Sequence, residues 1–360
     1  MKKKIITVCW ITLAWACIAV YQFADLHVTL LSERAIGPEY DAFSVLQTII
    51  VSVTLGGLLG GSAIVFLWEK WLRVLNFKLA MFMIVLCYTM IYMSLLWLSI
   101  ESIIDQNTLR AQQIIEQGGV LRAVFNPTII PNYIFWLAVM LSTLFLLFVR
   151  DRFGPGMLGS YIMGKYFRPV REEKVVMFLD LKDSTQIAES LGAERYFTFL
   201  NKLFQVVTSP ILDTNAQIYQ YVGDELVLTW DPKEAVKEAN CLQCFWKISN
   251  VLAENADAFD SLFGCKPAFK AGINAGIVVA GEVGVIKREV VYSGDVLNTA
   301  ARIRGLCNEL DHDLLISESV FKMLASDSSN IDFHEKGAFE LRGKAEPVNV
   351  YAPLLAVHTT

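Results

Sequence analysis

Four long apolar stretches constrain this 360-residue chain more than any other feature. They are Ile5–Ala24, Phe43–Leu67, Leu79–Ile100 and Tyr133–Val149. A helix needs roughly 20 apolar residues to cross the hydrocarbon core of a bilayer, and no Asp, Glu, Lys or Arg interrupts any of the four. The chain is 54% apolar and 19% charged, which is more apolar than an ordinary soluble protein. We therefore predict a membrane domain of four transmembrane helices over residues 1–149.

The first stretch follows three lysines, as the apolar core of a signal peptide does. Its apolar run is long, however, and no small-x-small cleavage site precedes the acidic stretch after Ala24. We expect it to remain in the protein as the first span.

The basic residues around these stretches predict an orientation. They lie at the N-terminus, between the second and third stretches, and after the fourth, and are Lys2, Lys3, Lys4, Lys70, Arg73, Lys78, Arg150 and Arg152. The alternate loops, 25–42 and 101–132, are mixed or acidic. The positive-inside rule places the N-terminus and everything after Arg150 in the cytoplasm. We expect a multi-pass protein of the cell (inner) membrane, in contact with the lipid bilayer.

Other features of the sequence argue against alternative functions. The spans carry no charge that would mark an ion path or proton relay, which argues against a transporter or channel. Their Gly-rich stretch Thr54–Ala63 predicts close helix packing. Cys241 and Cys244 form a C-x-x-C without a second pair, so we interpret them as packing residues rather than zinc ligands. The net charge of −5 and the lack of a basic patch with interleaved aromatics argue against nucleic-acid binding.

The C-terminal half has the pattern of an α+β domain. After a juxtamembrane linker (150–172), we expect a domain over 173–360. Its predicted elements are a strand at Val175–Leu179, helical structure over 184–213 broken near Gly192, a hairpin turning at Asp224, a helix over 232–254, a strand–turn–strand over 268–284, a helix after Ser293, a short strand at Leu314–Ser317 and a hairpin over 331–353. Strand, helix, two strands, helix and strand is the ferredoxin-like order.

Two pairs of polar residues in this domain are candidates for chemistry. Asp180 ends the first strand and Asp224 lies in the hairpin turn, so both carboxylates can meet at one edge of the sheet. Mg²⁺ is bound by one or two carboxylates together with substrate phosphates. The alternative is a solvated turn aspartate and an unrelated strand-end aspartate. Asn298 and Arg302 lie four residues apart on one helical face. They could orient a sugar and offset the charge of a phosphoryl group; the alternative is an ordinary exposed helix face. Arg304 is two residues further on and points in a different direction.

Four segments in this order resemble the catalytic domain of class III nucleotidyl cyclases. They are FLDLKDST (Phe178–Thr185), YVGDELVL (Tyr221–Leu228), AGINAGIVVAGEVG (Ala271–Gly284) and YSGDVLNTAARI (Tyr292–Ile303). The resemblance extends over about residues 173–353, half of the chain. It implies a ferredoxin-like class III cyclase fold in which two catalytic domains pair head to tail as a homodimer, with active sites at their interface.

The resemblance also implies roles for individual residues. Asp180 and Asp224 match the family's two metal-binding aspartates, and the backbone carbonyl of Leu181 would complete one metal shell. The implied cofactor is Mg²⁺ (or Mn²⁺), two ions per active site. Asn298 and Arg302 match the pair that serves the transition state and comes from the other protomer.

Further positions are implied for the substrate. Arg342 or Lys344 falls near the basic residue that contacts the terminal phosphates, and the sequence leaves both open. The base-reading pair falls on Gln220 and Val291, where adenylate-forming members more often carry Lys with Asp or Thr. Guanylate-forming members more often carry Glu with Cys or Ser. This chain carries neither pair, so the resemblance implies ATP only by the family's usual preference, with GTP as the alternative.

These observations predict a membrane-anchored adenylate cyclase that converts ATP to 3′,5′-cyclic AMP and pyrophosphate. The alternatives are a guanylate cyclase and a catalytically silent module that kept the fold. Silent copies usually lose a metal aspartate or the Asn/Arg pair, and this chain retains all four residues. The sequence therefore favours the enzyme.

Overall fold

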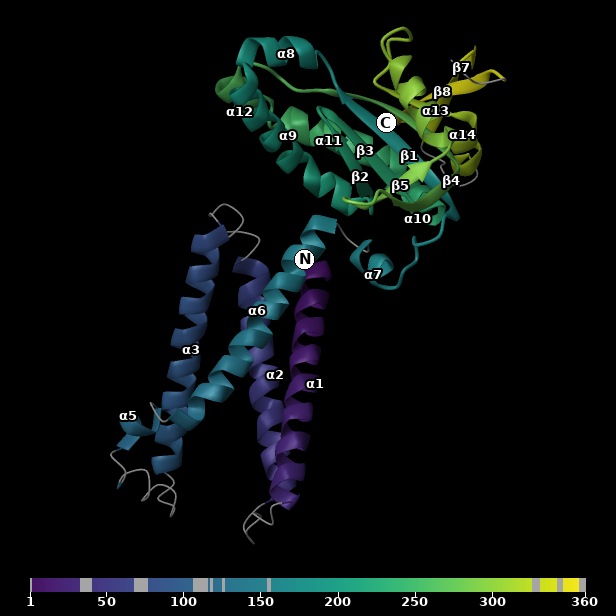
Figure 1. The fold of residues 1–360 in the computed structure, drawn as a ribbon. Coiled ribbons are helices and arrows are strands. Elements are labelled where there is room, and N and C mark those ends of the chain that lie inside the picture. The colour runs from purple at the N-terminus through teal and green to yellow at the C-terminus, as the bar shows by residue number, and fades with distance from the viewer. Residues whose placement is uncertain are drawn as a thin grey trace, which may run out of the picture. The chain divides into compact units, whose positions relative to one another are not determined.

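The computed structural model of the chain describes residues 2–32, 41–67, 77–105, 116, 119–124, 127–153, 157–325, 331–341 and 346–355. The chain divides into two compact units, Met1–Asp151 and Arg152–Thr360. We call them the helical unit and the sheet unit and describe each by itself (Figure 1).

The helical unit contains the predicted spans. Its elements are α1 (Lys2–Ser32), α2 (Ala42–Leu67), α3 (Phe77–Asp105), the short α5 (Gly119–Val124), a 3-10 turn (Pro127–Ile129) and α6 (Ile130–Phe153). By length and composition, α1, α2, α3 and α6 are each able to cross a membrane. The prediction of four apolar helices ahead of a sheet-containing domain is confirmed.

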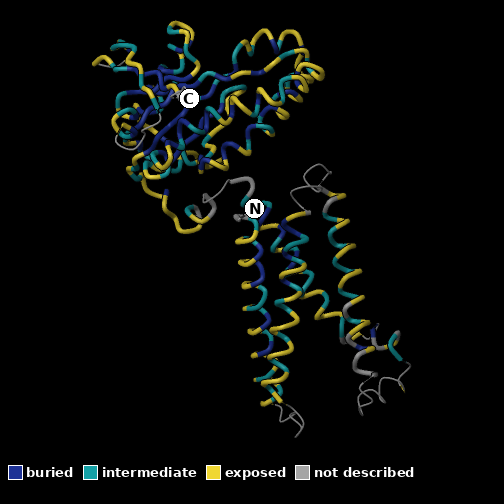
Figure 2. Tube along the Cα trace, turned by 180° about the vertical axis from the view of Figure 1, so that it is seen from behind, coloured by how far each residue is buried: buried dark blue, intermediate teal, exposed yellow. Residues whose placement is uncertain are grey.

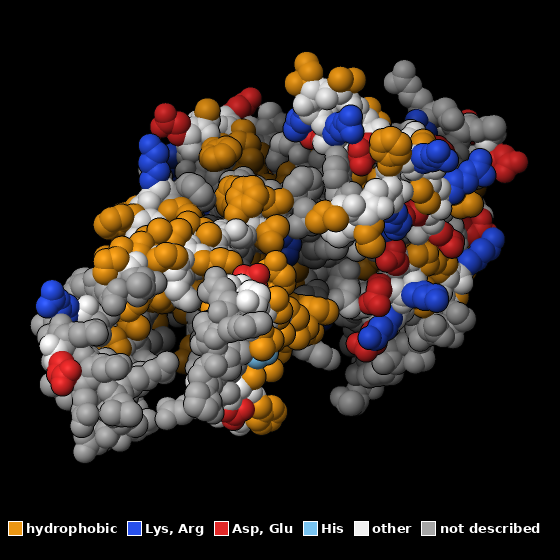
Figure 3. All heavy atoms as spheres, turned by 60° about the horizontal axis from the view of Figure 1, so that its bottom comes forward, with side chains coloured by type: hydrophobic (Ala, Val, Ile, Leu, Met, Phe, Trp, Pro, Cys, Tyr) orange, Lys and Arg blue, Asp and Glu red, His pale blue; other side chains and the backbone are white. Residues whose placement is uncertain are grey.

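Small residues bring α1 and α2 together. A Cβ on Gly57 would lie 3.0 Å from the Cα of Thr12, whereas one on Gly56 would meet nothing within 4 Å. Across the bundle, the indole of Trp15 donates a 3.0 Å hydrogen bond to the hydroxyl of Thr143. The predicted close packing of the Gly-rich stretch is therefore confirmed. Many large apolar side chains of this unit are exposed, and they gather on the face seen in Figure 3, while burial along its helices is partial (Figure 2).

The sheet unit is built on one large sheet. Its strands are β1 (Val170–Leu181), β2 (Gln217–Val222), β3 (Glu225–Trp230), β4 (Phe269–Val283), β5 (Glu289–Ser293), β6 (Leu314–Ser317), β7 (Ile331–Phe339) and β8 (Val348–Leu355). Within the described residues the order is β2-β3-β1-β4-β6-β8-β7, with β5 on β4. The first four strands of this order have the ferredoxin-like arrangement, as predicted, and the C-terminal hairpin extends the sheet.

Helices cover both faces of this sheet. The helices of the sheet unit are α7 (Met157–Ile162), α8 (Ser184–Leu191), α9 (Ala193–Asp213), α10 (Pro232–Val236), α11 (Asn240–Glu254), α12 (Ala256–Phe263), α13 (Asp295–Gly305) and α14 (Glu318–Leu324). The main core lies between one face and α9 and α11, and it includes Cys241 and Cys244, which confirms that they are packing residues. A smaller core joins α13 to the opposite face through Val296 and Ala300. Because side chains alternate along a strand, Leu179 enters the main core while its neighbour Asp180 lies on the α13 face.

The structure corrects three predicted boundaries. The segment 268–284 is one continuous strand, β4, rather than two strands with a turn. Its glycines instead permit close approach: a Cβ on Gly272 would lie 2.3 Å from the backbone nitrogen of Arg304 on α13. The predicted helix over 232–254 is divided, because Glu238 and Ala239 have positive φ angles of 53° and 52°. Strand β1 begins at Val170, inside the predicted linker.

Candidate active site

Asp180 and Asp224 lie on neighbouring strands at the same sheet edge. In the antiparallel pairing of β1 with β3, Leu179 faces Leu226. The next residues, Asp180 and Glu225, therefore come opposite one another, and Asp224 follows in the β2–β3 turn. Gly223 supplies the positive φ of 63° that this turn requires. The sequence thus places both carboxylates at one end of the β1–β3 pair.

Tyr196 on α9 lies in the electrostatic field of both aspartates. Burial raises the pKa of Tyr196, and the negative charges of Asp224 and Asp180 raise it further. A phenol resists ionisation beside carboxylates because a second negative charge is unfavourable there. Both carboxylates therefore act on the same hydroxyl.

Two basic side chains bind Asp180. Arg304 on α13 donates from Nη1 to Oδ2 of Asp180 at 2.9 Å, and Lys270 on β4 lies 3.3 Å from the same oxygen. The second Nη of Arg304 donates to Glu225. The Asp180 side chain is only 13% exposed, so these are partly desolvated contacts. Asp224, in contrast, forms no ion pair with any residue that the structure describes.

The donor set suits a hard cation that shares its ligands with a substrate. In the described part of the chain, no three His, Cys, Asp or Glu side chains group into a self-contained metal site. Asp180 and Asp224 supply carboxylate oxygens, which Mg²⁺ prefers, and phosphate oxygens complete such shells in nucleotide enzymes. The residues present therefore fit a divalent metal that binds with a phosphorylated substrate.

Asn298 and Arg302 lie on α13, which is anchored by its buried face. That face is formed by Val296, Thr299, Ala300 and Ile303. The side-chain amide of Asn274 donates a 3.1 Å hydrogen bond to the backbone carbonyl of Val296. Asn298 is exposed, and Nη1 of Arg302 is buried without a hydrogen-bond partner. A buried unpaired N–H is unfavourable, so Arg302 has unused capacity to donate to an acceptor outside the described residues of its own chain.

The predicted base-reading residues flank an aromatic stack. Tyr219 on β2 stacks on Tyr292 on β5 with ring centroids 4.7 Å apart, and its hydroxyl accepts a 3.0 Å hydrogen bond from the Tyr292 backbone N–H. Gln220 and Val291 are the chain neighbours of this pair. Gln220 is exposed and makes no side-chain hydrogen bond within the described residues, while Val291 is half-buried. Arg342 and Lys344 lie outside the described residues.

Three residues of this site did not follow from the sequence. Arg304, Glu225 and Lys270 contact Asp180 or one another across α13, β3 and β4. The available signal was the glycine at position 272, which allows α13 to lie close against the sheet. Its meaning depends on knowing which helix packs there.

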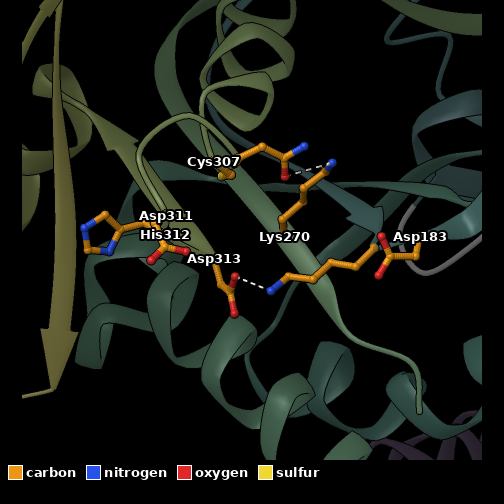
Figure 4. Close-up of a pocket in the computed structure, with 8 residues that line it drawn as sticks. Asp183, Lys270, Cys307, Asp311, His312 and Asp313 are labelled. Atoms are coloured by element: carbon orange, nitrogen blue, oxygen red, sulfur yellow. Dashed lines mark hydrogen bonds and ion pairs between the residues drawn. The ribbon is translucent and has the colours of Figure 1, made fainter. Parts of the chain in front are cut away.

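A polar pocket of about 230 Å³ adjoins the site through Lys270 (Figure 4). It is lined by Lys182, Asp183, Lys270, Cys307, Asn308, Asp311, His312 and Asp313. Lys270 lies 3.5 Å from the amide oxygen of Asn308, and Lys182 pairs with Asp313. Desolvation lowers the pKa of His312, as does the positive charge of Lys336. Lys182, Asp313 and Lys270 are thus each paired with an opposite charge.

Comparison with known proteins gives a consistent result. Residues 169–352 match the family model described as the adenylate and guanylate cyclase catalytic domain. The chain is 33% identical over 236 residues to adenylate cyclase 2 of Rhizobium meliloti, covering 65% of each protein. It is 25% identical over 198 residues to adenylate cyclase 1 of the same organism, covering 53% of this chain and 29% of that protein. The chain thus spans less than two thirds of these curated relatives.

The fold is also found in a solved structure. A bacterial light-regulated adenylyl cyclase superposes with a TM-score of 0.52 at 19% identity, covering 64% of this chain and 66% of that one. That likeness concerns the fold, whereas the match to the family model includes the segments that carry Asp180, Asp224, Asn298 and Arg302. The chain belongs to the family of adenylate and guanylate cyclase catalytic domains.

Proposed function

We propose that this chain is a membrane-anchored adenylate cyclase that converts ATP to 3′,5′-cyclic AMP and pyrophosphate as a homodimer. The observation that carries the proposal is the position of Asp180 and Asp224 at the same end of the neighbouring strands β1 and β3. The retained Asn298 and Arg302 on α13 support an active enzyme over a silent module. The names of the Rhizobium meliloti relatives favour ATP as the substrate.

Members of this family use a divalent metal, and here Asp180, Asp224 and the carbonyl of Leu181 would hold two Mg²⁺ or Mn²⁺ ions. When bound, the metal lowers the pKa of the ribose 3′-hydroxyl and neutralises the triphosphate. The protein's own donors supply the remaining stabilisation. Arg302 donates to the oxygens of the α-phosphate, where negative charge develops, and removing such a preorganised donor typically costs about 3 kcal/mol of barrier.

Other residues position the nucleotide. Asn298 orients the ribose, and Arg342 or Lys344 contacts the terminal phosphates. Gln220 offers an amide to the purine edge, while Val291 offers only apolar contact. A guanylate cyclase remains the second candidate because an amide can hydrogen-bond either purine.

Two features support a homodimer in which each site uses both protomers. Arg302 has an Nη1 that no described residue of its own chain pairs with, so its guanidinium keeps donor capacity for a substrate at a shared site. Asn298 is exposed beside it on the same helical face. A head-to-tail partner would bring its Asp180 and Asp224 to this face.

The membrane placement rests on the helical unit. Among the described residues, four helices are long and apolar enough to span a bilayer, and four crossings put both ends of the unit on one side. The basic residues at the N-terminus and after α6 favour the cytoplasmic side of the inner membrane, where ATP is available.

The activity test uses the detergent-purified full-length protein with Mg²⁺ or Mn²⁺, and with ATP and GTP in parallel. We expect cyclic AMP from the wild type and none from Asp224→Ala, with Asp213→Ala, an exposed aspartate on α9, as the matched control. Cyclic GMP as the main product would overturn the substrate assignment. No cyclic product under any of these conditions would favour the silent module.

The same variant tests the split site. Asp224→Ala and Arg302→Ala are each expected to be inactive, but a mixture that exchanges subunits forms heterodimers with one intact site. Random pairing in a two-fold dimer restores about a quarter of wild-type activity. A mixture as inactive as its components would contradict the shared site.

A further inference from the structure

The cation on Asp180 is the feature that the proposed function does not explain. Arg304 belongs to none of the catalytic roles described above, yet it binds Asp180 at 2.9 Å and also binds Glu225. With Lys270, these side chains form a group of two carboxylates and two cations. Its formal charge is zero before any metal or nucleotide arrives.

The backbone holds Arg304 in this place. In the pairing of β1 with β4, Gly272 lies opposite Phe178. Phe178 comes two residues before Asp180 on β1. A Cβ at position 272 would lie 2.3 Å from the backbone nitrogen of Arg304 and 2.5 Å from the backbone oxygen of Ala300. The last turns of α13 therefore press against the sheet, and the guanidinium reaches the end of β1 as a consequence of this close packing.

The contact is stronger than a surface ion pair. Arg304 and Glu225 are each 22% exposed and Asp180 is 13% exposed, and charge interactions strengthen as water is excluded. Nε of Arg304 is nevertheless buried without a hydrogen-bond partner. The guanidinium is thus held by its two carboxylates and not by a complete set of acceptors.

We propose that Arg304 is a resident counter-ion that lowers the affinity of Asp180 for a free divalent cation. This inference rests on the proposed function only in taking Asp180 as a metal ligand. A metal that approaches Asp180 alone meets a carboxylate already neutralised by Arg304 and Lys270. Nucleotide phosphates bring the negative charge that offsets this repulsion, so Arg304 links metal binding to nucleotide binding. Arg304 is a positioning residue in this account and touches no substrate.

Glu225 has an opposing role. It shares the guanidinium with Asp180, and without its charge Arg304 would pair with Asp180 alone. The two residues are therefore expected to change metal affinity in opposite directions. A purely structural contact between them predicts instead that both substitutions disturb the site in the same direction.

The test measures binding of Mn²⁺ alone to the full-length protein without nucleotide, by electron paramagnetic resonance. Because the positive charge of Arg304 beside Asp180 repels an approaching metal ion, we expect Arg304→Gln to tighten Mn²⁺ binding by about tenfold or more. Arg304→Lys keeps the positive charge but loses the two-pronged guanidinium, so it should tighten Mn²⁺ binding less than Arg304→Gln does. Lys182→Gln removes a nearby charge that pairs with Asp313 and should have little effect.

Further variants separate the possible failures. Glu225→Gln should weaken Mn²⁺ binding in the wild-type background and have a smaller effect beside Arg304→Gln, which a double-mutant cycle measures. If Asp180→Asn abolishes binding while Arg304→Gln leaves the Kd unchanged, the counter-ion role is wrong and the metal site stands. If Asp180→Asn binds Mn²⁺ like the wild type, the metal site of the proposed function fails. Should Arg304→Gln not fold, an unchanged Kd in Glu225→Gln would overturn the inference.

Discussion

The two units of this chain separate apolar and charged residues in opposite ways. In the helical unit, large apolar side chains such as Trp10 and Leu59 are 67% and 74% exposed, and the four apolar stretches within its helices contain no Asp, Glu, Lys or Arg. In the sheet unit large apolar side chains such as Phe199 and Trp230 are buried, and Asp180, Arg304, Glu225 and Lys270 meet at one sheet edge. The apolar exterior of the first suits lipid, whereas the second buries its core from water and keeps its charges for a site.

Both units nevertheless depend on glycine where two elements come close. Gly57 lets α2 approach the backbone of Thr12 on α1, and Gly272 lets α13 approach β4. The difference lies in what the close approach achieves. In the helical unit it packs two helices, while in the sheet unit it also carries Arg304 to Asp180.

The largest expected effect tests the closer of these contacts. Gly272→Ala would place a Cβ within 2.8 Å of three backbone atoms that cannot move without shifting α13. We expect it to lower the free energy of unfolding by about 3 kcal/mol, measured by pulse proteolysis across a urea gradient. Gly305→Ala, at the end of the same helix and with nothing within 4 Å of its Cβ, is the control and should change little. Equal stability of the two variants would mean that α13 does not pack as described.

A smaller effect is expected in the helical unit. Gly57→Leu would push α1 away at Thr12, whereas Gly56→Leu projects into open space. We expect a loss of about 1–2 kcal/mol for the first and little for the second, read from thermal unfolding in detergent. If both substitutions had the same effect, the face of α2 that contacts α1 would be wrongly assigned.

The smallest effect concerns the start of β1 and depends on pH. Burial raises the pKa of Glu172, but its ion pairs with Lys165 and Lys174 outweigh this effect, and the net pKa lies below the usual 4.5. A carboxyl with a depressed pKa stabilises the fold above its unfolded pKa and loses that contribution as pH falls through the folded value. Glu172→Gln should therefore lower the unfolding midpoint by on the order of a few degrees at pH 7.

That difference should shrink as the pH falls below about 4.5, where the wild-type carboxyl becomes protonated. Glu173→Gln, on the exposed neighbouring position, is the matched control. A difference between Glu172→Gln and the wild type that stayed constant down to pH 3 would indicate packing rather than charge.

Much of the architecture followed from local patterns. The spans were predictable because a bilayer requires long uncharged helices, and Asp180 was predictable as the end of a buried strand. Segment 268–284 was harder, because glycines that signal a turn in one context permit close packing in another. The break at Glu238 and Ala239 also had no local signal, since neither residue favours a positive φ.

By itself, the sequence determined the four apolar helices, the ferredoxin-like order of the sheet unit and the positions of Asp180, Asp224, Asn298 and Arg302. These depend on periodicity, turn chemistry and motif order, which are properties of neighbouring residues. Only the tertiary structure decided that Arg304 and Lys270 bind Asp180 and that Glu225 shares the guanidinium. Those contacts join β1, β3, β4 and α13 over long stretches of chain, and they exist because Gly272 lets a helix rest directly on the sheet.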